Sequence, residues 1–338
     1  MAASPEPDRR VWRGRLVLSL KAAIAAALVV WLVRGESLSA DLPARMADAP
    51  GRAGLVVLVL LLPLPLVAWR WRMLLGVVGV RLPFAFVCRL VAIGVFSGVF
   101  LPGGVGGDVV RLFYVAKAAP GRGVTAAATL LIDRLLGLGG LLVVALGVFV
   151  WQMAAGSLPP ILQQYGLAVL VVTVAGLAAV AGLMLFLGRS ALAGVPEATG
   201  RLGRLRGLFA AAAKDVALFR HALPTLAGGM VISIMGQAFT IAAVIVTASI
   251  FAAQGVGALD YALATPLAIL ANQVPLTPGG LGVGEGAFAQ ICRLLAPDGQ
   301  APFATIFLTF RGFGLIAALI GGIAWLTRDR QVPMSGSE

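Results

Sequence analysis

The sequence is poor in charged residues, cysteine and histidine. Only 12% of its 338 residues are charged, about half of the roughly 25% that soluble domains carry. The two cysteines, Cys88 and Cys292, lie in apolar surroundings, and the one histidine, His221, lies in a basic loop. No CxxC motif, Cys/His cluster or Ser-His-Asp arrangement can be built from them. We therefore expect no metal and no cofactor, and we assign no catalytic residue.

Apolar residues, in contrast, make up 60% of the chain. A soluble core cannot use so many apolar residues along a whole chain, whereas a bilayer can. The 26 Lys and Arg residues outnumber the 14 Asp and Glu residues and fall in short clusters between apolar runs. Such clusters are typical of cytoplasmic loops and not of an exposed nucleic-acid-binding face. The sequence therefore predicts an integral membrane protein that does not bind nucleic acid.

Six apolar runs approach or exceed the length of about 20 residues that a membrane-spanning helix needs. They are Leu16–Val33, Ala53–Trp69, Val124–Val150, Leu162–Leu187, Leu223–Phe251 and Ala301–Leu326. The first run resembles a signal peptide, but further spans follow it, so we interpret it as a transmembrane helix. Loop charges place the N-terminus (1–15), the basic loop (189–223) and the C-terminal tail (327–338) in the cytoplasm.

Two shorter apolar stretches, residues 84–116 and 259–295, are interrupted by glycines. The charges that flank the first stretch place both of its ends in the cytoplasm, and those that flank the second place both ends outside. Each stretch is therefore predicted to be a re-entrant hairpin. The whole chain, 1–338, then forms a single all-α polytopic membrane domain, with six full transmembrane helices and two oppositely oriented hairpins.

Each predicted hairpin carries a similar motif. The first reads Leu-Pro-Gly-Gly-Val-Gly-Gly-Asp over residues 101–108, and the second reads Pro-Leu-Thr-Pro-Gly-Gly-Leu-Gly-Val-Gly-Glu over 275–285. Proline and clustered glycines break a helix, and the freed backbone groups must be buried in protein or line a wet cavity. The helix that restarts after the motif points its N–H groups at the tip, which favours an anion such as phosphate.

Two such hairpins predict an inverted-repeat transporter with a site near the membrane midplane. The alternative is that the glycines only allow close helix packing, but packing alone does not explain the carboxylate that ends each motif. Charged residues inside the apolar stretches are further candidates, because charge at that depth is costly. Three arginines are expected to contact a lipid phosphate: Arg111, Arg134 and Arg311. Three carboxylates are expected to balance them or to carry a coupling proton: Asp108, Asp133 and Glu285. The alternative role for all six is structural ion pairing.

The predicted substrate-binding residues combine the motif residues and the intramembrane charges. Arg72, at the end of the second span, is included as a headgroup contact, whereas Arg70 and Trp71 are interpreted as interfacial anchors. The full set is Arg72, Pro102, Gly103, Gly104, Gly106, Gly107, Asp108, Arg111, Asp133, Arg134, Asn272, Pro278, Gly279, Gly280, Gly282, Glu285 and Arg311.

Taken in order, these motifs resemble the flippase-like membrane domain of lysylphosphatidylglycerol synthases. The matching segments are Trp-Arg-Met-Leu-Leu-Gly at 71–76, the first motif extended to Arg111, Ile-Asp-Arg at 132–134 with Gly-Leu at 137–138, and the second motif with Glu285. The resemblance covers nearly the whole chain and implies movement of phospholipids or other polar-headed lipids. The full synthases carry a soluble aminoacyl-transfer domain after the membrane part. This chain ends twelve residues past its last predicted span, so it is not expected to aminoacylate lipids itself.

We therefore expect a lipid flippase or transporter of the bacterial inner membrane that moves an anionic or phosphate-bearing lipid through a midplane cavity. A membrane-embedded transferase with Asp108 or Asp133 as general base is one alternative, but the short loops offer little room for a donor site. A non-catalytic partner of a lipid-modifying enzyme is the other alternative, and it would not need midplane charges. In each case the expected partners include membrane lipids.

Overall fold

The computed structural model describes residues 42–100, 106–164, 215–273 and 282–326, together with positions 171, 174–176, 178 and 182. The predicted span Leu16–Val33, most of Leu162–Leu187 and the two Pro-Gly-Gly runs lie outside these residues, as do the tail 327–338 and most of the loop 189–223. Throughout the described ranges the elements are helices, with one isolated β-bridge between Gln254 and Gln300. The all-α prediction is confirmed for this part of the chain.

Three helical stretches are long and apolar enough to cross a membrane. They are residues 50–77, which comprise α3 (Pro50–Leu61) and α4 (Pro63–Val77), then α7 (Gly123–Ala154) and α11 (Leu223–Ile250). Helices α3, α4 and α11 each have proline in the first turn, where its missing N–H is not needed. A further apolar helix, α14 (Phe303–Leu326), has 24 residues. These four stretches lie where the sequence predicts spans.

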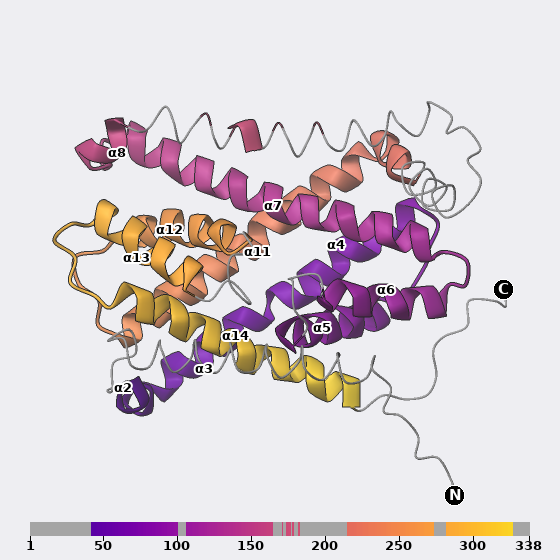
Figure 1. Cartoon of the computed structure of the whole chain (residues 1–338), viewed down its shortest axis with the longest axis horizontal. Coiled ribbons are helices and arrows are strands. Elements are labelled where there is room, and N and C mark those ends of the chain that lie inside the picture. The colour runs from indigo at the N-terminus through magenta and orange to yellow at the C-terminus, as the bar shows by residue number, and fades with distance from the viewer. Residues whose placement is uncertain are drawn as a thin grey trace, which may run out of the picture.

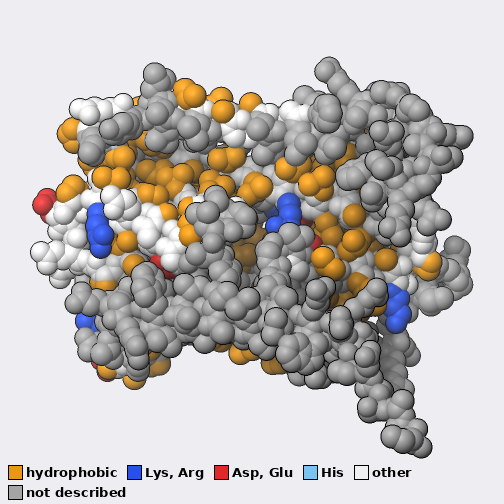
Figure 2. Space-filling model, viewed as in Figure 1, with side chains coloured by type: hydrophobic (Ala, Val, Ile, Leu, Met, Phe, Trp, Pro, Cys, Tyr) orange, Lys and Arg blue, Asp and Glu red, His pale blue; other side chains and the backbone are white. Residues whose placement is uncertain are grey.

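The surface of the described helices fits a lipid environment. Large hydrophobic side chains such as Leu58, Val231 and Leu319 are more than half exposed. On the face shown in Figure 2, hydrophobic side chains predominate wherever the described residues are visible, and charged side chains are few. Exposed apolar side chains on this scale would be unusual on a protein surrounded by water, so they support a multi-pass membrane protein.

Two pairs of shorter helices occupy the predicted hairpins. The first pair is α5 (Phe84–Phe100) with α6 (Gly106–Ala118), and the second is α12 (Ala258–Ala271) with α13 (Val283–Leu295). The longest of the four, α5, has 17 residues and is about 25 Å long, short of the roughly 30 Å of a bilayer core. The two pairs lie toward opposite ends of the long axis in Figure 1. Their lengths suit re-entrant hairpins, which stay a prediction.

The two halves of the chain interlock. The first helix of each pair packs against the last long helix of the other half: α5 against α14, and α12 against α7. One hydrophobic core is built mainly from α4 to α7, around Trp71 and Ile132, and a second from α3 and α11 to α14, around Phe288 and Phe307. Short helices complete the described structure: α2 (Leu42–Asp48), α8 (Pro160–Gln164) and the 3-10 turn η1 (Phe219–His221).

Candidate functional site

A buried ion pair joins α4 to α7. Arg70 Nε donates to Asp133 Oδ1 at 2.7 Å, and the two side chains are only 8% and 6% exposed. Arg70 Nη1 also donates to Ser233 Oγ on α11 at 2.6 Å. Gly229 on α11 lies beside this arginine and packs closely on α7, because a Cβ there would lie 2.8 Å from Leu136 Cδ1. Arg70 therefore connects three long helices at one point.

A second group of charges meets at the start of α6. Asp108, in the first turn of α6, accepts a hydrogen bond from Arg134 Nε of α7. Its other carboxylate oxygen lies 3.5 Å from Nη1 of Arg111, one turn further along α6. The predicted sharing of a helix face by Asp108 and Arg111 is therefore observed.

Arg111 lies deeper than its partners. Its guanidinium is 5.7 Å from the centre of the Trp71 ring, and its Nη2 donates to the Val91 carbonyl at 3.4 Å. The Nε atom is buried and has no hydrogen-bond partner among the described residues. Gly94 on α5 provides the space, because a Cβ there would lie 2.4 Å from Arg111 Nε.

These five charged residues form one cluster, which we call the first cluster: Arg70, Asp108, Arg111, Asp133 and Arg134. Arg111 interacts electrostatically with the other four. Within the cluster, three guanidinium groups face two carboxylates, which leaves one positive charge in excess. The Arg134 side chain is 42% exposed, whereas that of Arg111 is 10% exposed. The first cluster thus combines an accessible guanidinium, that of Arg134, with a buried one, that of Arg111.

The second hairpin carries a smaller charged group, which we call the second cluster: Glu285 on α13 and Arg311 on α14. Arg311 Nη1 donates to Glu285 Oε1 at 2.6 Å, and the backbone N–H of Gly282 donates to Glu285 Oε2 at 2.8 Å. Gly282 has φ +86°, a conformation that suits glycine. Asn272, at the end of α12, lies against Gly284, where a Cβ would be 2.3 Å from Asn272 Oδ1.

The structure brings some predicted site residues together and separates others. Arg72 lies on an exposed face of α4 and donates to the Leu82 carbonyl at 3.1 Å, outside both clusters. Gly106 and Gly107 are buried at the start of α6. The remaining tip residues lie outside the described part of the chain: Pro102, Gly103, Gly104, Pro278, Gly279 and Gly280.

Arg70 and Trp71 are the residues that the sequence interpretation missed. Both were interpreted as interfacial anchors, yet both are buried, and Trp71 Nε1 donates to Thr129 Oγ1 at 3.1 Å. The signal was present in the spacing, because Arg70 falls in the helical pattern of the buried residues Trp71, Leu74 and Leu75, whereas Arg72 does not.

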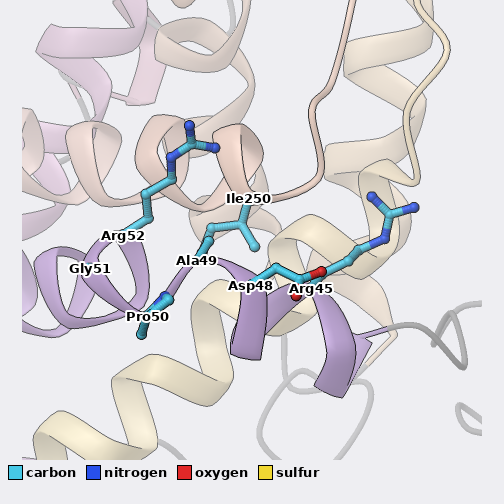
Figure 3. A pocket seen from close by; sticks show the side chains of 7 residues that line it. All are labelled: Arg45, Asp48, Ala49, Pro50, Gly51, Arg52 and Ile250. Atoms are coloured by element: carbon cyan, nitrogen blue, oxygen red, sulfur yellow. The ribbon is translucent and has the colours of Figure 1, made fainter.

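A surface hollow of about 450 Å³ lies elsewhere, where α2 and the start of α3 meet the end of α11. Its lining residues are Arg45, Asp48, Ala49, Pro50, Gly51, Arg52 and Ile250. Figure 3 shows the Arg45 and Arg52 side chains extending on different sides of it, and Arg52 Nη1 donates to the Ser249 carbonyl at 2.8 Å. It shares no residue with either cluster.

Comparison with known proteins identifies the family. The family model described as the lysylphosphatidylglycerol synthase TM region matches residues 18–322. No curated protein matches the chain at a significant level. The matched residues extend from the first predicted span into α14 and include both clusters, which confirms the resemblance found in the sequence motifs. The chain is therefore a member of the lysylphosphatidylglycerol synthase transmembrane-region family, a family of membrane proteins related to lipid modification or transport.

Proposed function

We propose that this protein transports a lipid with an anionic, phosphate-bearing headgroup across the membrane, and that the headgroup binds at the first cluster. The observation that carries the proposal is the excess positive charge of that cluster, together with the buried Nε atom of Arg111, which has no hydrogen-bond partner in the described part of the chain. An uncompensated charge at depth in a membrane is costly. A phosphate anion compensates it and matches the fork of N–H donors on a guanidinium.

The exposure of the arginines indicates an order of contact. Arg134 is the most accessible of the three guanidinium groups and meets the headgroup first. Arg111 lies behind it on the far side of Asp108 and supplies the further donor. Arg70 donates to Asp133 and to Ser233, so its role is to hold α4, α7 and α11 in register.

Matching geometry in the two halves supports a transporter built from inverted repeats. Asp108 and Glu285 each lie in the first turn of a return helix, and each pairs with an arginine 26 positions later on the next long helix. The residue before each carboxylate is a glycine in close contact with the first helix of its pair, Gly107 with the Gly94 carbonyl and Gly284 with Asn272. If α5 is matched with α12, and α7 with α14, the contact of α5 with α14 corresponds to the contact of α12 with α7.

The flanks of the second pair support its re-entrant path. The residues just before α12 and just after α13 meet in the β-bridge between Gln254 and Gln300. A segment that entered and left on opposite faces could not have its two ends in contact. This contact favours a hairpin that begins and ends on one side of the bilayer.

A reconstituted transport assay tests the proposal. Full-length protein in proteoliposomes is given fluorescent phosphatidylglycerol and, separately, a fluorescent diacylglycerol that has no phosphate. We expect facilitated movement of the phosphate lipid, and a loss of about tenfold or more in Arg111→Ala, equivalent to ~1.4 kcal/mol or more. Arg52→Ala removes an exposed arginine far from the cluster and is the matched control. Equal rates for both lipids, or equal losses in both variants, would contradict a phosphate site at the first cluster.

A further inference from the structure

A row of buried polar atoms without hydrogen-bond partners among the described residues lies along α12, the first helix of the second pair. Gln152 Oε1, Tyr261 OH, Thr265 Oγ1 and Asn272 Oδ1 are buried and have no hydrogen-bond partner in the described ranges. The last three are spaced four and seven residues apart, so they share one face of α12. That face lies toward α13: the Tyr261 ring stacks on Phe288 at 6.1 Å, and Asn272 contacts Gly284.

Thr265 differs from three hydroxyl residues of α11, although the buried Thr309 Oγ1 on α14 likewise has no hydrogen-bond partner among the described residues. Ser233, Thr240 and Thr247 on α11 each donate to the carbonyl four residues earlier, at 2.8, 3.0 and 2.7 Å. This local bond is the usual way in which a membrane helix satisfies a hydroxyl. Thr265 is fully buried and makes no such bond. The next residue, Pro266, has no N–H, so the carbonyl four residues before it also lacks its helical donor.

The row has two defined ends. At one end, Gln152 Nε2 lies 3.5 Å from Asp260 Oδ1, in the first turn of α12 and next to the loop that joins α11 to α12. At the other end, Asn272 lies against Gly284, the neighbour of Glu285. From Tyr261 to Asn272 the helix rises about 17 Å, roughly half of a bilayer core. Buried polar atoms without protein partners are the places where proteins hold internal water.

We propose that this row holds a chain of water molecules that carries protons between the Asp260 end of α12 and the Glu285 carboxylate. A proton that arrives on Glu285 converts the carboxylate to a neutral acid and weakens its attraction for Arg311. Arg311 is then held less tightly by Glu285 and takes up an anion. The purpose of the chain rests on the proposed transport function: it couples lipid movement to a proton gradient.

The surroundings of Glu285 suit this role. Helices α12, α14 and α8 pack against α13. The ionisable groups on them are Arg311 on α14, and Asp260 and Tyr261 at the far end of α12, while α8 contributes none. On α13 itself, Cys292 and Arg293 lie about two turns away. The proton therefore reaches a carboxylate whose one close charged partner, among the residues that the structure describes, is Arg311.

Hydroxyl-radical footprinting tests for the water chain without any transport measurement. Radicals formed from internal water oxidise nearby side chains, so Tyr261 should be oxidised in the full-length protein although it is 4% exposed. Phe149, which is 2% exposed and belongs to the same hydrophobic core, is the reference after correction for intrinsic reactivity. We expect several-fold more oxidation of Tyr261, and a fall in Thr265→Val but not in Thr247→Val, whose hydroxyl has its own local bond. Tyr261 as protected as Phe149 would overturn the water chain.

A second measurement tests the coupling. Proteoliposomes with a pH dye inside are given a pH gradient, and lipid translocation is followed with and without it. We expect the gradient to change the rate of the wild type and to have several-fold less effect on Thr265→Val and Glu285→Gln. Translocation that ignores the gradient overturns the coupling. An oxidised Tyr261 in a protein that moves no lipid contradicts the proposed function and leaves the water chain supported.

Discussion

Asp133 and Arg134 are neighbours in the sequence, yet α7 directs them to different partners. Asp133 accepts from Arg70 on α4 in the buried core, and Arg134 donates to Asp108 at the start of the first return helix. Successive residues of a helix are about 100° apart, so one pair of positions can serve two neighbouring helices. Asp133 and Arg134 therefore connect the buried Arg70–Asp133 pair to Arg134, the most exposed arginine of the first cluster.

The Arg70–Asp133 pair should be essential for stability. Arg70→Met leaves a buried carboxylate without its cation, which is expected to cost about 3–5 kcal/mol. The double variant Arg70→Met/Asp133→Leu removes both charges and should recover much of this loss. Thermal unfolding of the detergent-purified proteins measures both effects. A single variant that is no less stable than the double variant would contradict the pairing.

Removing Asp108 should strengthen anion binding. Asp108→Asn raises the excess positive charge of the first cluster from one to two, so phosphatidylglycerol should bind up to about tenfold more tightly, or ~1.4 kcal/mol. Native mass spectrometry with defined lipids measures the affinity. Asp48→Asn, which changes an exposed acid on α2 by the same chemistry, is the control. Unchanged or weaker binding in Asp108→Asn argues against an anion site there.

Gly107 should tolerate no side chain. A Cβ at this position would lie 2.1 Å from the Gly94 carbonyl oxygen, so Gly107→Ala must push α6 away from α5. We expect a destabilisation of about 1–3 kcal/mol, typical of overpacking. Gly286→Ala introduces the same methyl group on α13, where nothing lies within 4 Å, and should be neutral or slightly stabilising because alanine favours the helix. Equal unfolding temperatures of the two variants would show that the α5–α6 contact is looser than described.

Cysteine labelling can decide the predicted topology. In a cysteine-free background, single cysteines replace the exposed residues Arg81 and Arg122, which flank α5–α6, and Gln254 and Asp298, which flank α12–α13. Re-entrant hairpins predict that the first two react with an impermeant reagent from the cytoplasm and the last two from outside. If the two members of either set react from opposite sides, that helix pair spans the membrane.

The sequence predicted much of this arrangement, and the reasons for its failures are physical. Periodicity and length located the long helices, and the three-residue spacing of Asp108 and Arg111 predicted their shared face. The partner of Arg134 is set by the packing of α6 on α7, which no local pattern encodes. Arg70 was interpreted as an anchor because basic residues at helix ends usually lie at the interface, but the buried stripe of α4 continues through Arg70.

The interlocked packing of α5 on α14 and of α12 on α7 has a consequence for how the chain folds. Neither half can complete its core alone, because one helix of its hairpin is covered by the other half. Fragments made by cutting the chain between residues 189 and 214 should each be unstable when expressed singly and should assemble when they are co-expressed. The smallest unit that folds cooperatively is then the assembled pair of halves, and neither half is an independent folding domain.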